Sequence, residues 1–188
     1  MNAFINEYLK LNSLATQGGV VVFGDGNDAN IPVNELKQSF GIECPVYNRS
    51  FPSVTKDNAI ELYDTVIRPL KPETLLLHIG KGFAKFADEI NEQKYIELLS
   101  HIKRSDRCCR IIVISDGDKI VDERLKRLAS SENCEFIDIG ITSNWNPHAT
   151  KEAATFVKDM GIDSFVAKQP VFDLVKIFFG FERLKAAY

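Results

Sequence analysis

The chain has 188 residues, of which 45% are hydrophobic and 26% charged, and its formal net charge is -3. These values are near globular averages, so they exclude a disordered chain, a collagen-like repeat and a disulfide-knotted miniprotein. At ~150 residues per domain, the length predicts one domain over residues 1–188. The acidic balance, without a long basic run, excludes nucleic acid and an anionic membrane surface as expected partners.

The N-terminal segment does not have the pattern of an export signal. Glu7 and Lys10 interrupt its apolar part, whereas a secretory signal has a basic start and an unbroken apolar core. No stretch reaches the ~20 apolar residues that span a bilayer. We therefore expect a cytoplasmic protein.

The four cysteines show no Cys-x-x-Cys spacing, which argues against a metal site. Cys108 and Cys109 begin an apolar run, a position typical of a buried strand. We expect all four to be reduced core thiols.

Strand-like and helix-like segments alternate from the N-terminus onward. An amphipathic segment covers residues 2–16, and the apolar run 19–23 predicts a central strand that is buried on both faces. Pro32 and Gly41 bracket a helix. In the next strand, residues 44–47, the proline lacks an amide donor, which favours a place near the beginning of the strand or at the edge of the sheet.

The alternation continues through the second half of the chain. From Asp57 onward, apolar residues recur at helical spacing and predict a helix that covers one face of a sheet. The remaining expected elements are strands at 74–79, 110–114 and 135–139 and helices at 84–91, 94–104, 119–131 and 150–160.

Strands spaced by helices of this length require right-handed crossovers. We therefore predict an α/β fold, a three-layer α/β/α sandwich on a parallel sheet of about five strands, as in flavodoxin-like proteins. In such sheets ligands bind beyond the carboxyl ends of the strands. The loops at those ends are residues 24–28, 48–55, 80–83, 115–118 and 140–149.

Four segments at these loops carry a family resemblance. They read VVVFGDGND, YNRSFPSVT, VIRPLKPETLLLHIGKGF and NWNPHATKEAA. In order and spacing they resemble the four sequence blocks of the SGNH hydrolases, also called GDSL-like lipases and esterases. The resemblance covers about residues 19–160, and it leaves an N-terminal helix, 2–16, and a C-terminal extension, 163–188, outside it.

The resemblance implies a Ser nucleophile, a His base oriented by an Asp, and oxyanion donors that include a Gly amide and an Asn side chain. At these positions the chain has Gly26 for Ser, Ser53 for Gly, Gly82 for Asn and Trp145 for Asp. His148 is the one catalytic candidate that the match retains. We therefore expect a domain that has lost ester hydrolysis and acts as a binding or interaction module.

The same loops carry the residues that we expect to bind an unknown small molecule or protein. These are Asp25, Asn27, Ser53 and Lys81. We expect no cofactor, because the carboxylates in the GDGNDA turn would repel a dinucleotide pyrophosphate. We also expect no metal, because loop carboxylates are more often solvated than bound to a cation; those considered are Asp25, Asp28, Asp116 and Asp118.

An active esterase is the alternative. A relocated hydroxyl could replace the missing nucleophile if it lay within ~2.6–3.2 Å of His148. The candidates on the loops are Ser50, Ser53, Thr55 and Ser115.

The extension 163–188 has an apolar stripe formed by Val171, Leu174, Val175 and Phe178. Further phenylalanines add apolar surface beside this stripe. It can pack on the sheet of its own chain or form a homodimer contact.

Overall fold

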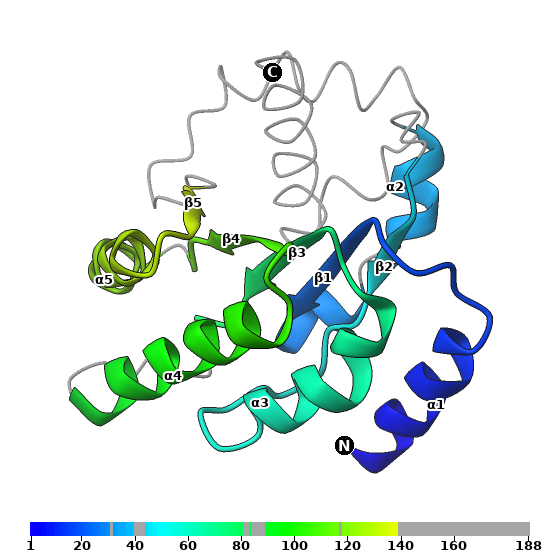
Figure 1. Ribbon diagram of the computed structural model, residues 1–188, viewed down its shortest axis with the longest axis horizontal. Helices are drawn as coiled ribbons and strands as arrows, with labels where there is room; N and C mark the ends of the chain where they lie inside the picture. The colour runs from blue at the N-terminus through cyan, green and yellow to red at the C-terminus, as the bar shows by residue number, and fades with distance from the viewer. Residues whose placement is uncertain (31, 40–43, 81–82, 84–88, 117, 139–188) are drawn as a thin grey trace.

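The computed structural model describes residues 1–138 except 31, 40–43, 81–82, 84–88 and 117 (Figure 1). Five parallel strands form one sheet in the order β2-β1-β3-β4-β5. The strands are β1 (Val20–Gly24), β2 (Val46–Asn48), β3 (Thr74–His78), β4 (Arg110–Ile114) and β5 (Glu135–Ile137). This flavodoxin-like order confirms the predicted fold class.

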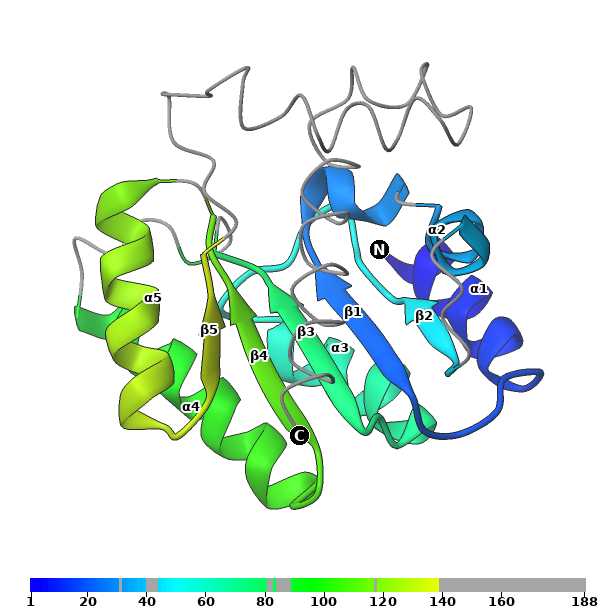
Figure 2. The ribbon, with the colours of Figure 1, turned by 90° about the horizontal axis from the view of Figure 1, so that it is seen from above.

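Helices lie on both sides of the sheet. They are α1 (Asn2–Asn12), α2 (Val33–Ser39), α3 (Ala59–Leu62), α4 (Glu89–Ser105) and α5 (Lys119–Ser131). Figure 1 shows α1, α3 and α4 along one side and α2 on the other, and Figure 2 shows α5 beside β5. None of these helices, in the part of the chain that the structure describes, is long and apolar enough to cross a membrane.

The core forms where the central strands meet the helices. Val21 and Phe23 of β1 and Leu75 and Leu77 of β3 belong to one cluster with side chains of α1, α4 and α5. The alternate residues of β1 are buried as well, so both faces of this strand are covered. Continuous burial explains why β1 is an unbroken apolar run.

Strand β2 lies at the edge of the sheet, and its proline stands at the beginning of the strand, so both places expected for the proline are observed. Its pairing starts at Val46, one residue after Pro45, whose carbonyl accepts a hydrogen bond from the amide of Val20 at 2.8 Å. The proline lacks an amide donor, so the ladder begins only after it.

The predicted break between residues 84–91 and 94–104 is wrong. One helix, α4, runs through from Glu89 to Ser105. Neither Gly nor Pro lies between Asn91 and Lys94, and the intervening Glu and Gln are good helix formers. Residues 84–88 lie outside the described residues.

The helix predicted from Asp57 is not one regular α-helix. After α3 the chain forms a π-helical turn, η2 (Tyr63–Ile67), and a 3-10 turn, η3 (Arg68–Leu70). The predicted stripe still packs inward, since Tyr63 and Ile67 are fully buried.

The cysteine prediction is partly wrong. All four thiols are free, but Cys108 is exposed and Cys109 is half-buried. The chain turns before β4, where the amide of Cys109 donates to the carbonyl of Asp106, so the strand begins only at Arg110. Burial raises the pKa of the Cys109 thiol to about 12.

Candidate functional site

The carboxyl ends of β1 and β3 form the topological switch point of the sheet. The chain leaves β1 toward β2 on one side and returns to β3 on the other. Gly24 and His78 are register partners there, and the amide of Asp25 donates to the carbonyl of His78 at 3.1 Å. Ligands of open parallel sheets bind at such points.

The turn after β1 folds back so that Asp28 lies against Gly24. A Cβ on Gly24 would lie 2.0 Å from the Asp28 Oδ2, which is closer than two such atoms can approach. Only glycine therefore fits at this position. A hydrogen bond from β2 holds the turn in place, because the Asn48 Nδ2 donates to the carbonyl of Asp28 at 2.7 Å. The Ser50 Oγ accepts from the amide of Gly24 at 2.9 Å. Asp28 is thereby held over the end of β3.

Asp28 forms an ion pair with His78, the last residue of β3. The His78 Nδ1 lies 2.6 Å from the Asp28 Oδ2, and the two side chains are 17% and 9% exposed. The His78 Nε2 is buried and, among the described residues, has no hydrogen-bond partner. A carboxylate on Nδ1 fixes the orientation of the ring and aims Nε2, as the Asp of a Ser-His-Asp triad does.

Two effects on the pKa of His78 oppose one another. Burial alone lowers it, because the imidazolium loses hydration. The hydrogen bond with Asp28 and the charges of Asp28, Asp116 and Asp25 outweigh burial, so the pKa of His78 is raised. The pair therefore makes the imidazole of His78 a stronger base than a free histidine.

His78 was missed from the sequence. The signal was present: in LLLH a polar residue ends an apolar strand directly at the edge where ligands bind. The pairing of His78 with Asp28 could not be predicted from the sequence, because Asp28 lies 50 residues away along the chain.

The structure places only some of the predicted site residues. Gly26 has a left-handed φ of +57°, and a Cβ added there would meet nothing within 4 Å. Asp25 is half-buried beside it, and Ser53 is exposed on the loop after β2. Asn27 belongs to the turn η1 (Gly26–Asn30). Lys81, Gly82, Trp145 and His148 lie outside the described residues.

Burial argues against two of the alternative nucleophiles. Ser50 and Ser115 are fully buried, and the Ser50 hydroxyl already bonds the amide of Gly24. Thr55 is half-buried and Ser53 exposed. Ser53 is thus the most accessible of the four hydroxyls.

The acidic residues at these loops have structural contacts. The Asp118 Oδ1 caps α5 by accepting from the amides of Ile120 at 2.9 Å and Val121 at 3.1 Å. Within the described ranges, no group of three or more His, Cys, Asp or Glu side chains could hold a metal ion.

No protein-family model and no curated protein matches the chain. Solved structures do match. A Streptococcus pneumonia protein, provisionally described as a platelet activating factor, has a TM-score of 0.62 at 14% identity, over 85% of this chain and 91% of its own. A GDSL-like lipase from Bacteroides thetaiotaomicron has 0.55 at 13%, over 72% and 77%. The chain has the fold of the SGNH hydrolases.

A third neighbour is a Bacteroides fragilis protein provisionally described as an acylhydrolase, with a TM-score of 0.56 at 14% identity, over 71% of this chain and 76% of its own. The similarity confirms the SGNH-like fold expected from the four segments. At such identities it shows the fold alone, so function has to be argued from the residues at the switch point.

Proposed function

We propose that this SGNH-like domain has lost ester hydrolysis and acts as a binding or interaction module. The observation that carries the proposal is Gly26, which stands where the SGNH resemblance places the nucleophilic Ser. A glycine offers no hydroxyl to attack a carbonyl, and Gly26 adopts a left-handed conformation that disfavours other residues.

The other positions of the resemblance support the loss. Gly82 stands in place of the oxyanion Asn and Trp145 in place of the Asp that orients His148. Losing one oxyanion donor typically lowers turnover ~10²–10³-fold. His148 would therefore lack both a nucleophile to activate and a carboxylate to hold its tautomer.

The ligand in this proposal is a small molecule or a protein that contacts Asp25, Asn27, Ser53 and Lys81. We further propose that residues 1–188 form one domain of a cytoplasmic protein.

An ester-hydrolysis assay tests the proposal. Purified protein is incubated with p-nitrophenyl acetate and butyrate, beside the variants Gly26→Ser and His148→Ala. We expect no turnover above the buffer rate, and little gain from Gly26→Ser because the Asn donor is still absent. Robust turnover that His148→Ala abolishes would contradict the proposal and favour the alternative, an esterase with a relocated Ser or Thr.

The ion pair at the switch point supports a variant of that alternative, in which His78 is the base. Turnover that survives His148→Ala but disappears in His78→Asn would assign catalysis to His78 and Asp28. Ser53→Ala, which changes the most accessible loop hydroxyl, would then show whether Ser53 is the nucleophile.

The apolar stripe of residues 163–188 motivates a separate proposal, a homodimer through this extension. Light scattering on the full chain and on Phe178→Asp tests it. A dimer that the substitution dissociates without unfolding supports the contact, and a monomeric mass at micromolar concentrations refutes it.

A further inference from the structure

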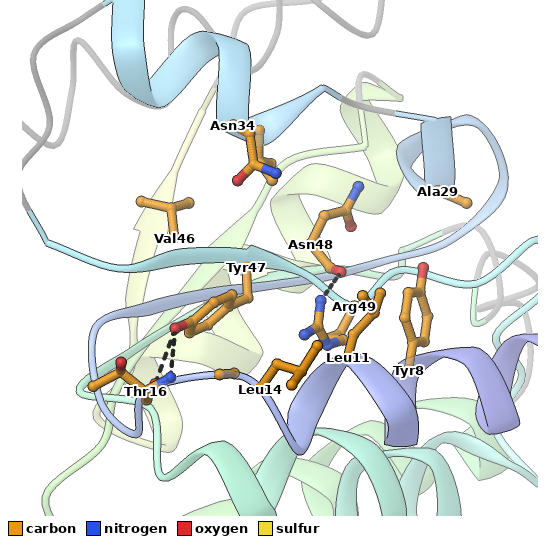
Figure 3. Close-up of a pocket in the computed structure, with 12 residues that line it drawn as sticks. Tyr8, Leu11, Leu14, Thr16, Ala29, Asn34, Val46, Tyr47, Asn48 and Arg49 are labelled. Atoms are coloured by element: carbon orange, nitrogen blue, oxygen red, sulfur yellow. Dashed lines mark hydrogen bonds between the residues drawn. The ribbon is translucent and has the colours of Figure 1, made fainter.

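A cavity of about 390 Å³ lies between α1, β2 and α2 (Figure 3). Its walls include Tyr8 and Leu11 of α1, Leu14 after that helix, and Tyr47 and Arg49 at the end of β2. Ala29 and Asn48 of its lining adjoin the switch-point turn, but neither Asp28 nor His78 lines the cavity, so it opens apart from the ion pair of the candidate site. We call it the Arg49 cavity. Its volume lies in the range of small-molecule sites.

Arg49 is a buried cation held in one orientation. The residue is 5% exposed, and its guanidinium carbon lies 5.2 Å from the Tyr8 ring centre and 5.3 Å from that of Tyr47. The Nε donates to the Asn12 Oδ1 and the Nη1 to the carbonyl of Asn48, both at 2.8 Å. Two aromatic faces and two hydrogen bonds thus fix the plane of the guanidinium.

The charge of Arg49 lacks a counterion among the described residues. Both of its hydrogen bonds to them go to neutral oxygens, which leaves three of the five N–H donors available. Buried charges in proteins are normally paired, because burial without a partner is costly. Burial accordingly lowers the pKa of Arg49. An anion in the cavity would supply the missing partner.

The rest of the cavity is suited to an apolar group. Leu11 and Leu14 are 44% and 85% exposed, a large exposure for side chains of this kind. Val46 lies on the strand side of the cavity, and the described lining contains no acidic side chain that would repel an anion. A ligand with an apolar tail would remove the leucines from water.

We propose that the Arg49 cavity binds a small monocarboxylate with an aliphatic tail. The carboxylate pairs with the guanidinium of Arg49, which matches carboxylate geometry with two parallel donors. The tail lies against Leu11 and Leu14. A single cation balances one negative charge, which favours a carboxylate over a dianionic phosphate. This binding site is independent of the proposed loss of hydrolysis.

Titration calorimetry with octanoate tests the proposal, with 1-octanol and inorganic phosphate as probes of the tail and of the charge alone. We expect octanoate to bind and the other two to bind at least roughly tenfold more weakly. Equal binding of octanol would reduce the site to an apolar surface and overturn the proposal. Equal binding of phosphate would overturn the carboxylate class, and no octanoate binding at millimolar concentration would overturn the site.

Two leucines of α1 give a matched pair of variants that keep Arg49 in place. Leu11 lines the cavity, whereas Leu9, 41% exposed on the same helix, is not among its lining residues. Leu11→Glu should weaken octanoate roughly tenfold or more, because it adds a like charge and removes a tail contact, and Leu9→Glu should not. Equal loss in both variants would show that the ligand binds elsewhere.

Arg49→Met tests the charge directly. Arg49 also holds Asn12 of α1, so this variant is first checked for folding by circular dichroism. If it is folded, we expect it to lose octanoate binding and retain weak binding of octanol. Retained octanoate affinity in a folded Arg49→Met would overturn the assigned role. If it unfolds, the Leu11 and Leu9 variants decide.

Discussion

The ion pair between His78 and Asp28 should stabilise the fold in a pH-dependent way, and Asp28→Asn isolates its charge. The asparagine nearly preserves the shape of the side chain and its acceptor oxygen but removes the negative charge. Because the two partners are only 17% and 9% exposed, solvent screens the pair little. A hydrogen bond to a charged group contributes ~1.5–3 kcal/mol. We expect the variant to lose about 2 kcal/mol near pH 6, or about 4–8 °C in Tm.

The direction of the pH dependence follows from the raised pKa of His78. The folded protein holds the imidazole proton more tightly than the unfolded chain does. This stabilisation is fully present below the unfolded pKa of about 6.5, and it is lost as the pH rises through the folded pKa. The difference between wild type and Asp28→Asn should therefore be largest near pH 6 and shrink toward pH 9. Urea unfolding at both pH values measures it.

A second histidine–aspartate pair provides the control. The His101 Nε2 lies 3.0 Å from the Asp64 Oδ1, but these side chains are 26% and 34% exposed. Exposed pairs contribute ~1 kcal/mol or less, so Asp64→Asn should cost clearly less than Asp28→Asn. If the two variants cost the same, or if the cost of Asp28→Asn does not change with pH, the reasoning from burial is refuted.

Two further predictions concern local packing and thiol chemistry. Gly24→Ala should destabilise by about 3 kcal/mol in urea unfolding, since its Cβ would collide with Asp28, whereas Gly26→Ala should cost about 1–2 kcal/mol for its left-handed φ alone. Equal costs would contradict the close approach of Asp28 to Gly24. At pH 8, iodoacetamide followed by peptide mass spectrometry should label exposed Cys108 well before Cys109, whose pKa is about 12, and the reverse order would refute the assigned burial.

The sheet was predictable because its signals are local. An apolar run such as Val20–Gly24 must be a buried strand, and alternation with helices leaves few possible topologies. The predicted break within α4 was wrong because the polar residues between Asn91 and Lys94 continue the helix instead of ending it. The π-helical turn η2 could not be foreseen, since it depends on how the segment packs against the core rather than on residue type.

The candidate site was predictable only in part. The loop after β1 was recognised from its strand and its glycines. The pairing of His78 with Asp28 depends on which strand lies beside β1, and the contact of Arg49 with Tyr8 depends on the docking of α1. Both join residues that lie tens of positions apart, and no short-range pattern specifies such contacts. A polar residue at the end of an apolar strand was therefore the sequence signal that could locate the candidate site, as His78 shows.

The strand order has a consequence for synthesis on the ribosome. β1 is translated first among the strands, yet it is an inner strand that needs β2 on one side and β3 on the other. Its second neighbour begins at Thr74, about 50 residues after Gly24, which at about 5–20 residues per second is a delay of roughly 3–10 s. During that time the nascent Val20–Gly24 segment exposes its apolar side chains and an unpaired backbone edge, so chaperones that bind extended apolar segments should bind it.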